Sequence, residues 1–141
     1  MGLNVDSVAY EDIQFQIFDL GGQVAFRDLW EAHVGTANGI VYVIDAADPS
    51  LFAESQEALI ACLSQIPAKS LLMILANKSD LVESVSLTTI ITTFKWIEIQ
   101  TMYDFKAINL FHLSTKTGER FDESFQWLFE KIIRHSQAKN Q

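Results

Sequence analysis

Cysteine is almost absent from this sequence of 141 residues, which contains Cys62 alone. A single cysteine excludes an internal disulfide framework, so a reducing compartment is the simpler expectation. Cys62 lies in the segment E-A-L-I-A-C-L, whose pattern is typical of the apolar face of a helix. We therefore expect a buried, unreactive thiol.

Positive charge is also scarce. Lys and Arg number 10 against 18 Asp and Glu, which gives a formal net charge of −8. Binding to nucleic acid needs clustered Lys and Arg, and the sequence has no such cluster, so this function class is excluded. There is no charged-then-apolar leader pattern, no evident membrane anchor and no apolar run of membrane-spanning length. We expect a cytoplasmic protein.

Glycine occurs six times, at positions 2, 21, 22, 35, 39 and 118, and none of these residues precedes a lysine. The phosphate-binding loop G-x-x-x-x-G-K-[ST], which cradles phosphates with its backbone, is therefore absent. Residues 18–23 nevertheless read F-D-L-G-G-Q, which suits a loop that senses a phosphate.

Strand and helix patterns alternate along the chain. Two short alternating runs predict a β-hairpin, and two continuous apolar runs predict central strands covered on both faces. The hairpin runs are Val5–Tyr10 and Ile13–Phe18, the apolar runs are Gly39–Asp45 and Ser70–Ala76, a further strand is Ile108–Leu113, and helices are expected after Asp48, over Ser86–Phe94 and from Asp122. This order predicts a three-layer α/β fold with a mostly parallel central sheet, helices on both faces and a ligand at the carboxyl ends of the strands.

The first candidate site ends the second strand at Asp19, Gly21, Gly22 and Gln23. An acid there can hold a magnesium ion through water, and a glycine lets a backbone N–H meet a terminal phosphate. A glutamine beyond it can orient a water for attack. The alternative is a plain strand-to-helix turn with a capping acid.

The second candidate site follows the apolar strand directly and consists of Asn77, Lys78, Ser79 and Asp80. Guanine presents N1–H and N2–H₂ donors on one edge, which a single carboxylate such as that of Asp80 can accept together. Asn77 can bridge neighbouring loops, and the stem of Lys78 can lie along the ring. The alternative is a polar turn.

The third candidate site is Ser114, Thr115 and Lys116, which follow the strand that ends at Leu113. A backbone N–H here suits the guanine O6, and Lys116 can cover the base from the other side. S-T-K-T-G alone is an unremarkable turn. The order of the three sites, each at a strand end, is the informative observation.

The motifs D-L-G-G-Q, N-K-S-D and S-T-K, in this order, resemble those of the Ras-like small GTPases. G-L-N-V-D-S-V-A-Y, F-D-L-G-G-Q-x-x-F-R-x-L-W and G-I-V-Y-V-I-D-A-A-D are similar to the Arf and Sar branch of these GTPases. The resemblance covers essentially the whole chain, residues 1–141, as one domain. It identifies the sequence as an Arf-type small GTPase.

The resemblance implies a role for each candidate residue. Asp19 would be the magnesium residue, acting through water, Gly22 the γ-phosphate donor and Gln23 the catalytic glutamine. The guanine-binding residues would be Asn77, Lys78, Asp80, Ser114, Thr115 and Lys116. Three positions that form an aromatic partner-binding cluster in Arf proteins correspond to Leu3, Phe18 and His33.

In that family the phosphate loop and a switch threonine precede the G-x-N-V stretch. We therefore expect an N-terminally incomplete domain that lacks the first strand and first helix. The missing strand would lie between the strands that contain Asp19 and Gly39, and its loss would leave unpaired edges. Several unpaired backbone groups at about 1–3 kcal/mol each are serious against a total stability of about 5–15 kcal/mol.

The expected function is therefore a guanine-nucleotide switch of the Arf/Sar type, which in the complete domain hydrolyses GTP to GDP with Mg²⁺ in vesicle or membrane traffic. An exchange factor, a GTPase-activating protein and effectors are the expected partners, and a complete parent protein would be peripheral to endomembranes. The alternative is a non-hydrolysing pseudo-GTPase that serves as a protein-interaction module. The segment Lys95–Lys106 is expected either to form a partner surface or to pack against the last helix.

Overall fold

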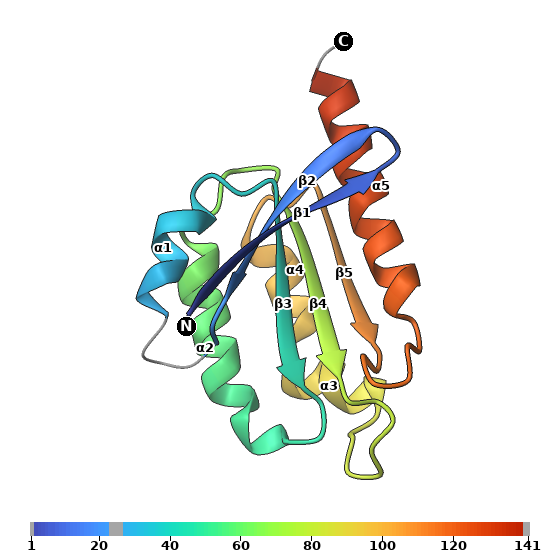
Figure 1. The fold of residues 1–141 in the computed structure, drawn as a ribbon. Helices are drawn as coiled ribbons and strands as arrows, with labels where there is room; N and C mark the ends of the chain where they lie inside the picture. Colours follow the sequence, from blue (N-terminus) through green and yellow to red (C-terminus); the bar gives the residue numbers. More distant parts are fainter. Residues whose placement is uncertain (1, 23–26, 140–141) are drawn as a thin grey trace.

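The computed structural model describes residues 2–22 and 27–139, and the side chains of residues 2–22 and 27–134. The elements in chain order are β1 (Leu3–Tyr10), β2 (Ile13–Leu20), α1 (Asp28–Val34), β3 (Gly39–Asp45), the 3₁₀ turn η2 (Pro49–Leu51), α2 (Phe52–Leu63), β4 (Leu71–Asn77), α3 (Leu87–Thr93), α4 (Trp96–Met102), β5 (Ala107–His112) and α5 (Phe121–Lys139) (Figure 1).

The predicted hairpin is confirmed. β1 and β2 pair antiparallel, with Leu3 opposite Leu20 and Tyr10 opposite Ile13. The two turn residues, Glu11 and Asp12, both have positive φ values, 48° and 65°. Two-residue turns of this handedness match the natural twist of paired strands, so the local sequence is enough to fix the register.

The second sheet is parallel, in the order β3-β4-β5. Its middle strand, β4, is buried from Leu71 to Ala76, as its continuous apolar sequence predicts. Leu72, Ile74 and Ala76 belong to one core cluster, whereas Leu71, Met73 and Leu75 belong to the other. The alternation places one half of the strand's side chains on each face of the sheet.

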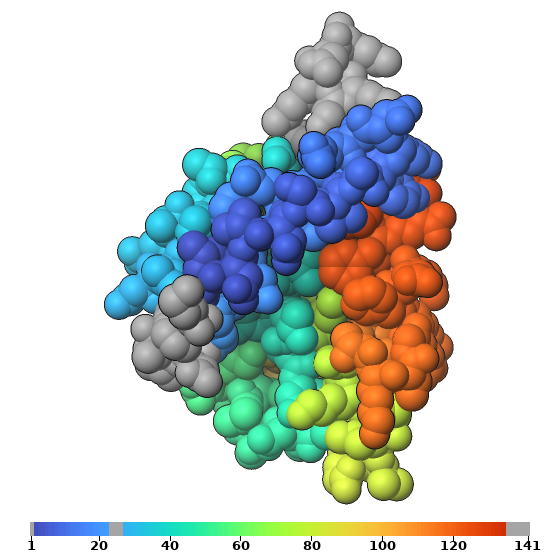
Figure 2. Space-filling model, in the orientation of Figure 1, coloured from blue at the N-terminus to red at the C-terminus, as the bar shows by residue number. Residues whose placement is uncertain are grey.

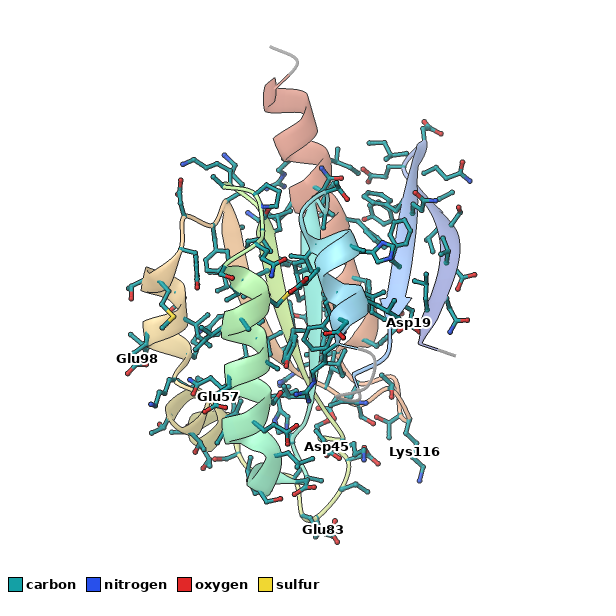
Figure 3. All side chains as sticks on the ribbon, turned by 90° about the vertical axis from the view of Figure 1, so that its left-hand side faces the viewer. Asp19, Asp45, Glu57, Glu83, Glu98 and Lys116 are labelled. Carbon is teal, nitrogen blue, oxygen red and sulfur yellow. The ribbon has the colours of Figure 1, made fainter. Side chains whose placement is uncertain are left out.

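Helices cover both faces, as predicted. The first core cluster packs α2, α3 and α4 against one face through Phe52, Leu59, Phe94 and Ile99. The second packs α5 against the opposite face through Leu128. In Figure 3 the helices α2, α3 and α4 lie on one side of the sheet, and α5 and the hairpin lie on the other. The α/β layered fold is thus confirmed.

The prediction that Gly39–Asp45 is a central strand covered on both faces is wrong about its place in the sheet and, at one residue, about its burial. β3 pairs with β4 alone, and no ladder joins it to β2 within residues 2–22 and 27–139. β3 is therefore an edge strand, and Val43 has 59% of its surface exposed. In the part of the chain that the structure describes, no strand pairs with β3 on the side away from β4, and that edge of β3 therefore has no ladder partner.

Aromatic contacts tie the hairpin to the remainder of the molecule. Phe15 stacks on Phe129 of α5 with ring centroids 4.5 Å apart, and Tyr10 lies 5.3 Å from the same ring. Phe18 stacks on His33 of α1 at 4.8 Å. Figure 2 shows the hairpin lying across the side of the molecule that faces the viewer, against α5. Packing, rather than a shared ladder, holds the two sheets together.

The segment Lys95–Lys106 contains α4, and its expected packing against the last helix is wrong. Trp96 and Ile99 are 9% and 0% exposed, and both belong to the cluster on the side of α2 and α3. α5 lies on the opposite face of the sheet.

Cys62 is buried, as expected, and burial raises the pKa of its thiol to about 11. Within the described part of the chain, no helix is both long and apolar enough to cross a membrane.

Candidate functional site

The loop after β4 is fixed to the end of β5. The Ser79 N–H donates to the Leu113 carbonyl at 2.9 Å, and the Leu113 N–H donates to the Ala76 carbonyl at 2.9 Å. Lys78 has φ of 73°, a conformation that non-glycine residues rarely adopt. The turn is therefore tightly constrained, and it brings N-K-S-D beside S-T-K.

Asn77 joins the two loops with both atoms of its amide. Its Oδ1 accepts the Thr115 N–H at 3.0 Å, and its Nδ2 donates to the Thr115 Oγ1 at 3.2 Å. An amide engaged on both atoms is fixed in orientation as well as in position. The bridging role that the sequence predicts for Asn77 is thus visible in the structure.

Asp80 and Ser114 form the second link between the loops. The Ser114 Oγ donates to the Asp80 Oδ1 at 2.8 Å and accepts the Thr117 N–H at 3.1 Å. Ser114 is fully buried, whereas Asp80 is exposed. The turn closes at Gly118, whose φ of 85° favours glycine and whose N–H donates to the Ser114 carbonyl at 2.9 Å. The hydrogen bond from the buried Ser114 therefore fixes the orientation of the Asp80 carboxylate, while the side chain of Asp80 stays exposed to solvent.

Lys78 pairs with Asp45, the last residue of β3, at 2.7 Å between Nζ and Oδ2. Partial burial alone would raise the pKa of Asp45, but the hydrogen bonds from Lys78 and from the Ala47 N–H outweigh it and lower the pKa. The same hydrogen bond raises the pKa of Lys78. Asp45 was not among the predicted site residues. The sequence feature that could have indicated Asp45 is its place at the end of an apolar strand. In the structure, Asp45 lies opposite Asn77 in the parallel ladder.

The residues predicted to meet phosphate and magnesium lie elsewhere. Asp19 is exposed near the end of β2, and Gly22 follows it. Asp19 does not cap α1, because Arg27 is the N-cap residue. Gln23 lies outside the described residues. Among the described residues, no hydrogen bond or ion pair links Asp19 or Gly22 to the loops that contain Asn77 and Ser114.

Two side chains hold the glycine turn from the start of α1. The Trp30 Nε1–H donates to the Gly21 carbonyl at 3.1 Å, and the Arg27 Nε–H donates to the Gly22 carbonyl at 3.2 Å. Arg27 also pairs with Glu54 of α2 at 3.0 Å. Among the described residues, a Cβ added to Gly22 would meet no atom within 4 Å, and Gly22 itself is exposed.

The predicted residues therefore fall into two groups. Figure 3 shows Asp45 and Lys116 at the lower end of the molecule, where β3, β4 and β5 end, and Asp19 higher, on the hairpin. An open hollow of about 230 Å³ adjoins the end of β3 and is lined by residues that include Arg27, Asp45 and Glu54. No group of three or more His, Cys, Asp or Glu that could hold a metal occurs within the described part of the chain.

Comparison with known proteins decides the family. The family model described as the ADP-ribosylation factor (Arf) family matches residues 1–132. The chain belongs to the Arf family.

Individual relatives agree with this assignment. Over 91% of this chain, the sequence is 30% identical to ADP-ribosylation factor-like protein 1 of Drosophila melanogaster, of which it covers 69%. Over 94% of the chain it is 29% identical to the protein of the same name in Caenorhabditis elegans, of which it covers 72%. Over 82% of the chain it is 34% identical to the small COPII coat GTPase SAR1 of Giardia intestinalis, of which it covers 65%.

A solved structure confirms the fold. The Arl6 (BBS3) small GTPase from Trypanosoma brucei, solved with the bound nucleotide analogue GppNp, superposes with a TM-score of 0.81. The match covers 95% of this chain and 81% of that protein, at 22% sequence identity. The Ras-like GTPase fold is therefore established, while the Arf assignment rests on the family match over residues 1–132.

Proposed function

We propose that this Arf-family chain is a guanine-nucleotide-binding switch whose base site lies between the loops 77–80 and 114–118. The observation that carries the proposal is the pair of links that hold these loops together, Asn77 to Thr115 and Ser114 to Asp80. Ordered polar groups at the carboxyl ends of parallel strands are the usual setting of a ligand site.

Asp80 is the residue that selects guanine. Its Oδ1 is oriented by Ser114, its Oδ2 makes no hydrogen bond among the described residues, and the side chain is exposed. A carboxylate fixed in this way can accept the N1–H and N2–H₂ donors of guanine, which adenine does not present as a pair. In this proposal the stems of Lys78 and Lys116 cover the two faces of the base, and a backbone N–H of the 114–116 turn donates to O6.

For hydrolysis we propose that the hairpin end supplies the phosphate contacts. With GTP and Mg²⁺ bound, Gly22 would donate its N–H to the terminal phosphate, Asp19 would hold Mg²⁺ through water, and Gln23 would orient the attacking water. The open space at Gly22 and the exposed carboxylate of Asp19 fit these roles. When bound, GTP with Mg²⁺ would supply the phosphoanhydride bond, which water cleaves to give GDP and inorganic phosphate.

The relatives suggest where such a switch acts. One relative is named a small COPII coat GTPase and others are named ADP-ribosylation factors. We propose a role in vesicle or membrane traffic, in which an exchange factor, a GTPase-activating protein and effectors act on a cytoplasmic protein that visits endomembranes.

Binding of fluorescent GDP in the presence of Mg²⁺ tests the base site. Asp80→Ala is expected to weaken GDP binding by about 100-fold, because two charge-assisted hydrogen bonds to the base are lost. Asp6→Asn, on the exposed side of β1, serves as the control and is expected to leave binding unchanged.

A second substitution separates base reading from misfolding. Xanthine carries an oxygen where guanine has its 2-amino group, so an amide can donate to that oxygen while it accepts N1–H. The Asp80→Asn variant is therefore expected to bind xanthosine diphosphate more tightly than GDP. If the folded wild-type chain binds no guanine nucleotide, the proposal is wrong and the interaction module becomes the better account.

A further inference from the structure

The side chain of Lys78 is fixed at both of its ends. At its base the backbone has φ of 73°, and at its tip Nζ lies 2.7 Å from the Asp45 Oδ2. The four methylene groups between these points span from the end of β4 to the end of β3. A lysine on a surface turn ordinarily samples many rotamers, and ordering it costs free energy when a ligand binds.

Asp45 is itself held by the backbone. Its Oδ1 accepts the Ala47 N–H at 2.9 Å, which leaves Oδ2 directed at Lys78. The neighbouring Ala46 N–H donates to the Asn77 carbonyl at 3.0 Å, so the strand end that carries Asp45 is joined to the base loop. The anchor is therefore part of the sheet and does not depend on a flexible loop.

Stability does not account for this ion pair. The side chains of Lys78 and Asp45 are 48% and 33% exposed. Exposed pairs of this kind contribute little to folding, because water screens the charges and ordering the side chains opposes the gain. The pair Lys69–Asp104, at 3.3 Å, has the same residue types and is 59% and 62% exposed, but it lies at the opposite end of β4, before the strand begins.

The alternative partners of Lys78 show what the pair prevents. Asp48 and Asp80 are the other carboxylates whose charges act on the Lys78 ammonium. If Lys78 turned to Asp80, it would compete with guanine for the carboxylate that selects the base. An ammonium held at the end of β3 is not free to pair with Asp80.

We propose that Asp45 is a positioning residue for guanine recognition: it holds Lys78 by its ammonium group, so that the stem forms a ready wall for the base and Asp80 stays available to it. The inference rests on the proposed function, because it concerns the same base site. It assigns to Asp45 a part in nucleotide affinity, without contact to the nucleotide.

The test is a double-mutant cycle on the affinity for GDP. Asp45→Asn keeps the size of the side chain and its acceptor for the Ala47 N–H but removes the charge that holds Lys78. It is expected to raise the Kd for GDP about fivefold to tenfold, which corresponds to the cost of ordering one long side chain. In the background of Lys78→Ala the same substitution is expected to change the Kd less than twofold. Asp104→Asn, which breaks the matched ion pair, is expected to leave the Kd unchanged.

A second readout is independent of nucleotide. The rate at which acetic anhydride modifies each lysine of the folded chain, followed by mass spectrometry of peptides, is expected to rise severalfold at Lys78 in Asp45→Asn and to stay constant at Lys69. A constant rate at Lys78, or equal effects of Asp45→Asn with and without Lys78, would overturn the inference while GDP binding by the wild type still supports the proposed function. No GDP binding by the folded wild type would overturn both.

Discussion

The Ser114 hydroxyl orients Asp80 from a buried position, and this makes it the most sensitive single group of the site. It donates to the Asp80 Oδ1 and accepts the Thr117 N–H, and Ser114 is fully buried. Ser114→Ala is expected to weaken GDP binding about tenfold and to lower the free energy of unfolding by about 1–2 kcal/mol, because two hydrogen bonds are lost, one to the Asp80 carboxylate and one from the Thr117 N–H.

Fluorescent GDP titration and urea unfolding measure these two effects. Ser64→Ala is the matched control, since its exposed hydroxyl donates only to the Ala61 carbonyl of its own helix. Equal effects of the two substitutions on GDP binding would contradict a special role for Ser114.

His112 makes the stability of the protein depend on pH. Burial, with a smaller contribution from Arg120, lowers its pKa below the ordinary 6.5. The unfolded chain then binds this proton more readily than the folded chain. The contribution of the neutral imidazole is therefore fully present above about pH 6.5 and is lost as the pH falls from there through the folded pKa.

His112→Gln keeps a hydrogen-bonding group near Ser84, whose Oγ lies 3.0 Å from the His112 Nε2, but it cannot titrate. Urea unfolding of both proteins between about pH 7.5 and about pH 5 is expected to show a steeper loss of stability in the wild type. Parallel curves would show that His112 has the same pKa in both states.

Among the strands, β3 is one that carries an aggregation risk. It is an edge strand, and Val43 projects from it with 59% exposure. Val43→Lys is expected to change the free energy of unfolding by less than about 0.5 kcal/mol and to reduce association at high concentration, because a charge on an open edge opposes strand pairing. Light scattering against concentration measures association. Val41 projects from the same face of β3 but packs against the second core cluster, so Val41→Lys is expected to destabilise the fold instead.

α4 offers a matched pair of isoleucines. Ile99 is fully buried among α2 and α3, whereas Ile97 is 61% exposed. Ile99→Ala is expected to lower the free energy of unfolding by about 2–5 kcal/mol, through lost burial and a cavity, and Ile97→Ala by less than about 0.5 kcal/mol. Chemical denaturation of both variants measures these changes in the free energy of unfolding. A large cost for Ile97→Ala would mean that this face of α4 is not open to a partner.

The sequence predicts elements well where one local pattern dominates. The hairpin was predicted because its turn residues and its alternation of apolar and polar residues both indicate paired strands. β4 was predicted because its apolar run is continuous. α4 was not predicted, since W-I-E-I-Q-T-M is too short to show a helical period and begins after Lys95 with positive φ. The burial of β3 was misjudged because a continuous apolar run does not report whether a neighbouring strand exists.

The site divides in the same way. Asn77, Asp80 and Ser114 were predicted from motifs at strand ends, and the structure brings them together. Asp45 was missed because its role depends on the parallel register that places it beside Asn77, which is a tertiary property. The roles of Asp19, Gly22 and Gln23 stay predictions.

The division into two sheets predicts which parts of the molecule unfold locally at the lowest free energy. β1 and β2 form their own sheet, which the rings of Phe15 and Phe129 join to α5, while β4 is buried between two layers of helices. Backbone amides of a unit with fewer buried contacts exchange at a lower opening free energy. Native-state hydrogen exchange is therefore expected to show lower protection in β1 and β2 than in β4. Phe15→Ala is expected to reduce hairpin protection about tenfold or more, through loss of an aromatic contact, without changing β4. Gln16→Thr, at an exposed position of the same strand, is the control. An equal loss of protection in β4 would show that the hairpin and the parallel sheet unfold as one unit, which the separate ladders do not predict.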